Sequence, residues 1–216
     1  MNVSDLRPYV ATTVPDAPNP LIDREIVLAA REVCEEAPLW VEVLTAIPTV
    51  NGQGAYTLTH ATGDVVRAQR HEVLFGGVSL RQRSVAQANR RYPGWRTDTG
   101  ATLHSFVLTD PHTLAVIPVP NAALGDLTVT VQLRPKFGAT TLPDQAAEDW
   151  RDAVVSNAIA RLASMPNEPW SAPQVAAIHG QKYQIERAQA VAAHAKGQAR
   201  GEGRVIPYSH DTQRAS

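Results

Sequence analysis

The sequence predicts an α+β protein: an antiparallel β domain inserted between an N-terminal helix and two C-terminal helices that pack as a helical layer, with an extended C-terminal tail. Three observations predict this. Apolar residues follow helical spacing up to residue 37, alternate with a period of two over residues 39–134, and return to helical spacing after Pro143. We therefore expect a helical domain (residues 1–38 and 135–200), a β domain (39–134) and a flexible tail (201–216).

Length and composition exclude several classes of protein. The 216 residues suffice for one large domain or two small ones. The single cysteine, Cys34, excludes an internal disulfide framework and a cysteine-based zinc finger. A formal net charge of −1 argues against a generic basic nucleic-acid binder. Because no apolar run is long enough to span a bilayer, and residues 1–6 lack basic and apolar signal regions, we expect neither a membrane span nor a secretion signal.

The first helix is expected from residue 20 to residue 37. Asn19 can cap it, and Pro20 suits its first position because a proline has no N–H to leave unpaired there. Pro38 ends it. Its apolar face consists of Ile22, Ile26, Ala29, Ala30, Val33 and Ala37. Cys34 lies at the edge of this face, where a buried and chemically inert thiol is expected.

Six or seven short strands are expected next. The segments are Leu39–Ile47, Ala55–Thr59, Val65–Phe75, Val78–Leu80, Leu103–Thr109, Thr113–Val119 and Leu127–Arg134. Residues 110–112 predict a hairpin turn, and Ser84 predicts the cap of a short helix that stops at residues 92–95. In the last strand, Leu127, Val129, Val131 and Leu133 alternate with Thr128, Thr130, Gln132 and Arg134. This alternation predicts one buried face and one solvated face.

Two helices are expected after the strands, over residues 143–164 and 172–196. The second carries a narrow apolar seam of Ile178, Ile185, Ala188, Ala192 and Ala195. Alanines allow close approach of another helix but bury little surface. We expect Gly197 and Gly201 to end this helix, and the polar tail after residue 201 to be disordered on its own.

A search for catalytic, metal-binding and cofactor-binding patterns finds none. The seven histidines show no His-x-x-x-His spacing and no pairing with Cys34. The sequence also lacks a complete phosphate-binding glycine loop and a Gly-x-Ser-x-Gly nucleophile turn. We therefore expect no enzyme activity, no metal and no cofactor. A hydrolase assembled from dispersed residues stays open.

Basic residues concentrate in one part of the β domain. Residues 67–96 contain seven arginines and one acidic residue, Glu72; the arginines are Arg67, Arg70, Arg81, Arg83, Arg90, Arg91 and Arg96. Three interpretations are open: a solvated face balanced by acids elsewhere, contact with an acidic protein surface, and contact with nucleic acid. Few aromatic residues are present for base stacking, which weakens the last.

The C-terminal segment carries a smaller basic excess together with a short apolar cluster, Val205-Ile206-Pro207-Tyr208. Such clusters in polar tails commonly become ordered on binding a partner. We interpret Arg200, Arg204, Ile206 and Tyr208 as candidate docking residues, with a terminus of no function as the alternative.

Several short motifs, taken in order, resemble one protein family. They are Asn19-Pro20-Leu21-Ile22-Asp23, Ala29-Ala30-Arg31-Glu32-Val33-Cys34-Glu35 followed by Trp40, Asn51-Gly52 to Tyr56-Thr57-Leu58, Arg91-Tyr92-Pro93-Gly94-Trp95, Ile117-Pro118-Val119-Pro120, Leu127 to Pro135, Ala158 to Leu162, and Pro169-Trp170. Over residues 18–200 the chain resembles the head–tail adaptor proteins of tailed bacteriophages, a group that includes connector and tail-tubular proteins.

The resemblance implies a structural virion protein made in the host cytoplasm and located at the head–tail junction. It would form a ring, by resemblance a dodecamer, under the portal protein. This ring would extend the channel for double-stranded DNA and contact the next tail protein, whether a nozzle, gatekeeper or tail-tube protein. The main alternative is a small-ligand or carbohydrate-binding β module, which predicts a concave apolar pocket in a monomer.

If the chain forms such a ring, tight phosphate binding along the channel would impede DNA passage. We therefore expect the arginines of residues 67–96 to face neighbouring subunits or the portal rather than to line the channel uniformly. Arg67, Arg70, Arg81, Arg83, Arg90, Arg91, Ile178 and Ile185 are the candidate contacts between subunits or with a partner. A ring of identical subunits is built from head-to-tail contacts between two different surfaces of the chain, and two differently charged sides favour such contacts.

Overall fold

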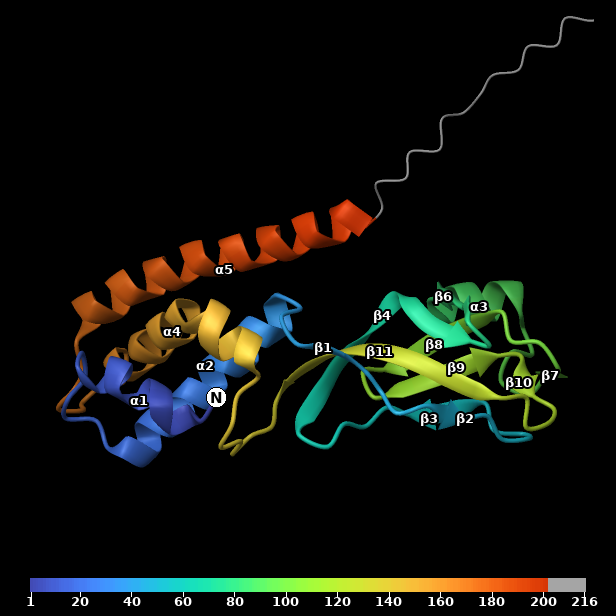
Figure 1. Cartoon of the computed structure of the whole chain (residues 1–216), viewed down its shortest axis with the longest axis horizontal. Helices are drawn as coiled ribbons and strands as arrows, with labels where there is room; N and C mark the ends of the chain where they lie inside the picture. Colours follow the sequence, from blue (N-terminus) through green and yellow to red (C-terminus); the bar gives the residue numbers. More distant parts are fainter. Residues whose placement is uncertain (202–216) are drawn as a thin grey trace, which may run out of the picture.

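The computed structural model describes residues 1–201, apart from the side chains of Gln145 and of residues 195–201. The chain forms a helical lobe and a β lobe that lie end to end along the long axis of the molecule (Figure 1). Mixed helices and a largely antiparallel sheet confirm the predicted fold class.

The helical lobe is built from both ends of the chain. It contains α1 (Val3–Ala11), α2 (Asn19–Glu36), the π-helical turn η1 (Gln145–Asp149), α4 (Arg151–Ala163) and α5 (Pro173–Gly201). Helix α2 packs between α1 and α4, and α5 lies along α4. Ile22, Ile26, Val33 and Leu162 are completely buried where these helices meet. No helix in residues 1–201 is long and apolar enough to cross a membrane.

Helix boundaries differ from the sequence prediction in three places. Asn19 does not cap α2 but is its first residue, because the extended Pro18 precedes it at the capping position without a side-chain hydrogen bond. The prediction of a single N-terminal helix was wrong, because α1 precedes α2 and buries Val3, Leu6 and Val10 despite the internal Pro8. Gly197 does not end the last helix, since α5 continues to Gly201. Glycine costs a helix only about 1 kcal/mol relative to alanine, so a single glycine does not decide where a helix stops.

The β lobe contains two main sheets around a second apolar core. One sheet has the strand order β1-β11-β4-β5, with β2 also paired to β11; the other has the order β3-β9-β8-β6. The strands are β1 (Val41–Val43), β2 (Ile47–Pro48), β3 (Ala55–Thr57), β4 (Gly63–Phe75), β5 (Val78–Ser79), β6 (Arg81–Arg83), β7 (Thr99–Gly100), β8 (Ser105–Asp110), β9 (Thr113–Ile117), β10 (Val119–Pro120) and β11 (Asp126–Pro135), and the lobe also holds α3 (Val85–Arg91). Two pairs, β6/β8 and β7/β10, are parallel, so the sheet is not antiparallel throughout.

Local signals in the β region were predicted correctly. Ser84 caps α3: its hydroxyl accepts a hydrogen bond from the Gln87 backbone N–H at 3.1 Å, and the Gln87 side chain accepts one from the Ser84 N–H. Strands β8 and β9 form the predicted hairpin around residues 110–112.

Strand β11 is buried on more than one face. Leu127, Val129, Val131 and Leu133 are fully buried together, as predicted. The prediction that the opposite face is solvated was wrong for Thr130 and Gln132, which are also buried. Gln132 is buried because its side chain packs against the C-terminal end of α2. The Gln132 Nε2 donates hydrogen bonds there to the carbonyl oxygens of Cys34 at 2.5 Å and Glu35 at 3.1 Å.

A second polar contact joins the lobes beside Gln132. Arg31 of α2 is almost completely buried and its Nη1 donates to Asp64 Oδ2 of β4 at 2.9 Å. The same nitrogen donates to the Pro135 carbonyl, and the guanidinium lies 3.7 Å from the centre of the Phe137 ring. These directional contacts set the orientation of the helical lobe relative to β4 and β11.

The predicted inert thiol at Cys34 is confirmed as a buried side chain. Burial in apolar surroundings raises the pKa of Cys34 to about 12, so the reactive thiolate is scarce at neutral pH. We expect the native protein to resist a thiol reagent such as dithionitrobenzoate and to release about one equivalent of chromophore only on unfolding. Rapid stoichiometric labelling of the native protein would contradict this expectation, and an exposed-cysteine variant such as Thr109→Cys is the positive control.

Candidate interaction surfaces

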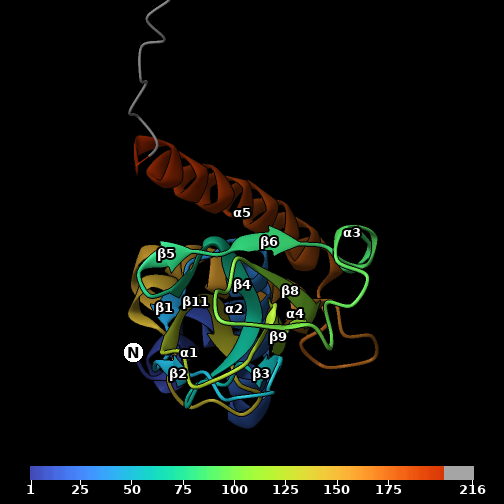
Figure 2. The same ribbon diagram turned by 90° about the vertical axis from the view of Figure 1, so that its right-hand side faces the viewer.

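The seven arginines of residues 67–96 gather on β4, β6, α3 and the turn after α3. We call this set the arginine face. Arg83 is partly buried and the other six are exposed. Strands β4 and β6 and helix α3 lie on the same side of the molecule as α5, which packs on the helical lobe (Figures 1 and 2).

Within residues 1–194, none of these seven arginines forms an ion pair. The contrast with the helical lobe is clear, because there arginines are matched with carboxylates: Arg7 with Asp23, Arg24 with Glu25, Arg31 with Asp64, Arg151 with Asp152, Arg161 with Glu25 and Glu32, and Arg187 with Glu36. A guanidinium without an internal partner remains available for bidentate binding of a carboxylate or phosphate from another molecule.

Local contacts orient part of the arginine face without neutralising it. Arg67 Nε donates to Gln132 Oε1 at 2.7 Å, and the Arg96 guanidinium lies 4.7 Å from the centre of the Trp95 ring. The positive charge of the arginine face affects a neighbouring histidine. The pKa of His104 is lowered, first by burial and then by the charges of Arg83 and Arg91. The face therefore disfavours additional positive charge.

Helix α5 has one side packed on the helical lobe. Tyr183 and Ala190 are buried there, and the Tyr183 hydroxyl donates to Glu32 Oε1 at 3.2 Å. Burial and the nearby Glu32 carboxylate raise the pKa of Tyr183, which keeps its hydroxyl protonated at neutral pH. Arg187 pairs with Glu36 at 2.8 Å on the same side.

The predicted seam of α5 lies on its outward side. Ile178 is 65% exposed and Ile185 is 61% exposed, and Ala188 and Ala192 are exposed as well. The face that packs within the molecule, around Tyr183 and Ala190, was missed because its polar members Tyr183, Glu186 and Arg187 hide the periodicity. Within the described residues, no other helix of the chain covers these exposed isoleucines.

One member of the arginine face, Arg67, approaches α5 between the lobes. His194 of α5 has a lowered pKa, caused first by burial and then by the charge of Arg67 on β4. The structure therefore brings the two predicted contact sets, the arginines and the α5 residues, to one side of the molecule. The side chain of Arg200, and all of Arg204, Ile206 and Tyr208, lie outside the described residues.

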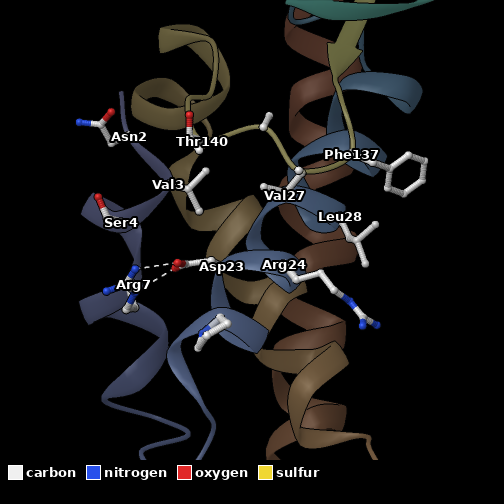
Figure 3. Close-up of a pocket in the computed structure, with 13 residues that line it drawn as sticks. Asn2, Val3, Ser4, Arg7, Asp23, Arg24, Val27, Leu28, Phe137 and Thr140 are labelled. Carbon is white, nitrogen blue, oxygen red and sulfur yellow. Dashed lines mark hydrogen bonds and ion pairs between the residues drawn. The ribbon is translucent and has the colours of Figure 1, made fainter.

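A groove of about 520 Å³ lies on the helical lobe, in a place that no sequence motif indicated. Its walls are α1 and α2, and the loop of residues 137–140 closes one end (Figure 3). Leu28 and Phe137 contribute apolar surface, with Phe137 72% exposed, and the buried Val27 lies beneath them. Arg7 and Asp23 pair across the groove, with the closer of two hydrogen bonds at 2.6 Å.

The described geometry favours neither a metal site nor the ligand-binding alternative. Among the described residues, no group of three or more His, Cys, Asp or Glu side chains is placed to hold a metal ion. The groove between α1 and α2 lies on the helical lobe, whereas the ligand-binding alternative predicts a pocket in the β domain.

Comparison with known proteins gives one positive result. A family model described as SU10 adaptor protein matches residues 1–207. This match covers both lobes and all of α5. No curated protein matches the chain.

Proposed function

From the premise that the chain belongs to the SU10 adaptor family, a bacteriophage head–tail adaptor family, we propose that it assembles as a ring under the portal and extends the channel for double-stranded DNA. The family places the protein at the head–tail junction of the virion, in contact with portal and tail proteins, and argues against an enzyme. A dodecameric ring matching the portal is part of the proposal.

The observation that carries this proposal is the arginine face. Its seven arginines have no carboxylate partner in the described part of the chain, and Arg67 approaches α5 near His194. The exposed Ile185 and Ile178 lie 9 and 16 residues before His194, on the part of α5 that packs on the helical lobe. Unpaired charges and exposed apolar side chains are both typical of surfaces that other proteins cover. The elements that carry them lie on the same side of the elongated molecule (Figures 1 and 2), where separate neighbours can contact them. We propose that this side faces neighbouring subunits or the portal and does not line the DNA channel uniformly.

The direction of α5 supports a role for the end of the chain. Helix α5 carries Gly201 away from the helical core, to the edge of the molecule (Figure 1). We propose that Arg200, Arg204, Ile206 and Tyr208 contribute to portal docking, with arginines binding carboxylates and the apolar cluster filling a pocket. We also propose that residues 1–38 with 135–200, residues 39–134, and residues 201–216 act as the three functional units.

The experiment is co-purification with the portal protein from the same genome. Full-length protein is expected to form rings on the portal, and a version ending at Lys196 to lose about tenfold or more in affinity, since about 1.4 kcal/mol of docking contact suffices for that. Native mass spectrometry and electron microscopy of the complex measure ring occupancy. The matched control is full-length protein with Arg200→Ser and Arg204→Ser, which separates charge from chain length.

Two results would contradict parts of this proposal. Equal ring occupancy for the full-length and shortened proteins would remove residues 197–216 from the docking contact. A full-length protein that binds no portal would remove the ring proposal for this chain.

A further inference from the structure

The outward side of α5 is almost uncharged over residues 173–194. Its exposed side chains are Pro173, Gln174, Ala177, Ile178, Gln181, Lys182, Gln184, Ile185, Ala188, Gln189, Val191, Ala192 and Ala193, of which one carries a charge. A helix side that faces water normally carries charged residues. We call this side the neutral face of α5. A lack of charged residues is typical of the core of a protein–protein interface.

The groove between α1 and α2 has the complementary property. Its accessible apolar residues Leu28 and Phe137 lie in the same groove as the Arg7–Asp23 ion pair at 2.6 Å. Arg24, at the edge of the groove, contacts the buried Glu25 at 3.3 Å, and Glu25 also pairs with Arg161. In Figure 3 the Phe137 and Leu28 side chains point outward on the same side of α2. An uncharged helix can cover the Arg7–Asp23 pair without burying an unpaired charge of its own. A strongly charged partner would lose hydration in the groove without gaining an ion pair.

These two surfaces lie on different sides of the helical lobe. Helix α5 runs along one side of the lobe, and α1 and the loop of residues 137–140 lie on the side away from it (Figure 1). One molecule can therefore use both surfaces at once with two different neighbours. Such heterologous contacts close into rings when the rotation between copies allows it.

We propose that the neutral face of α5 seats in the groove between α1 and α2 of a second copy of the chain. Ile178 and Ile185 lie seven residues apart, about 10.5 Å along the helix, so both can contact the accessible surface formed by Leu28 and Phe137. This contact rests on the proposed ring and deepens it by naming its subunit interface. It leaves the arginine face free for the portal or the tail protein.

The test uses pairs of cysteine variants, because the native Cys34 is buried and does not form crosslinks on the surface. Ile185→Cys and Leu28→Cys are prepared separately in the full-length protein, mixed at high concentration and oxidised. The mixture is expected to give covalent dimer about tenfold above either variant alone, since a heterologous contact brings one position of each kind together. Ile185→Cys mixed with Thr109→Cys, an exposed position on β8, is the matched control.

A double variant with both cysteines distinguishes the outcomes further. In the free protein or on the portal, it is expected to give a ladder of crosslinked multimers, which Ile178→Glu in the same chain abolishes. Dimers formed by Ile185→Cys alone would indicate an α5–α5 contact and overturn the proposal. Rings on the portal without any ladder would also overturn the proposed subunit contact while leaving the adaptor role intact. A ladder without portal binding would support the subunit contact and contradict the proposed ring on the portal.

Discussion

Asp64→Ala is expected to lower the free energy of unfolding by about 3 kcal/mol, because removing one partner of a buried ion pair leaves the other charge uncompensated. Arg31 is the buried partner, with 6% of its side chain exposed, and Asp64 supplies the carboxylate at 2.9 Å. The Pro135 carbonyl and the Phe137 ring still contact the guanidinium in the variant, which places the effect at the lower end for such pairs.

Chemical denaturation followed by circular dichroism and tryptophan fluorescence measures this change. Asp126→Ala, an exposed carboxylate at the start of β11 without an ion pair in the described structure, is the matched control and is expected to change stability by about 0.5 kcal/mol at most. The double variant Arg31→Met, Asp64→Ala is expected to be more stable than Asp64→Ala alone, since no buried charge remains. An Asp64→Ala protein as stable as the original would show that the Arg31–Asp64 pair contributes little to joining the lobes, which Gln132 and the Arg134–Glu35 ion pair at 2.6 Å also connect.

Charge reversal on the arginine face is expected to produce the largest loss of partner binding. Arg70, Arg81 and Arg90 are exposed and lack ion pairs among the described residues, so their replacement by glutamate costs the fold little. An exposed ion pair contributes up to about 1 kcal/mol, so three lost pairs weaken portal or tail-protein binding by about a hundredfold at low salt. Affinity for each partner is measured at several ionic strengths, because screening reduces the difference.

The matched control replaces Lys136 and Arg151, two exposed cations of the helical lobe outside the groove, by glutamate, and is compared with the Arg70 and Arg81 double variant. This control is expected to keep partner affinity within a few-fold of the original protein. Equal losses in both double variants would indicate a general charge effect and contradict the assignment of the arginine face. If the Arg70, Arg81 and Arg90 variant instead loses only DNA retention in assembled particles, the arginines line the channel.

The exposed isoleucines and the arginine face explain how one chain can contact several neighbours. Each interaction is proposed to use a separate surface: the neutral face of α5 and the groove for copies of the chain, and the arginine face for the portal or tail protein. The rigid contacts at Arg31 and Gln132 hold these surfaces at a fixed relative orientation. Variants that weaken them are therefore expected to disturb assembly before they unfold either lobe.

The fold class follows from the sequence alone, because the hydrophobic period reports directly which backbone geometry can bury a segment. Local sequence patterns also predict α2, the cap of α3 at Ser84, the β8/β9 hairpin and the buried row from Leu127 to Leu133, all of which depend on neighbours in the chain. The ordered motifs pointed to the adaptor family, which the match over residues 1–207 confirms.

Long-range packing establishes which polar residues are buried and which surfaces are left uncovered. Gln132 and Arg31 are ordinary polar positions in the sequence, and their burial results from the packing of α2 on β11 and β4. The same packing placed the α5 isoleucines outward and formed the groove from α1, α2 and residues 137–140, which are far apart in the chain. Long-range contacts of this kind have no local periodicity, so the sequence pattern carries no sign of them.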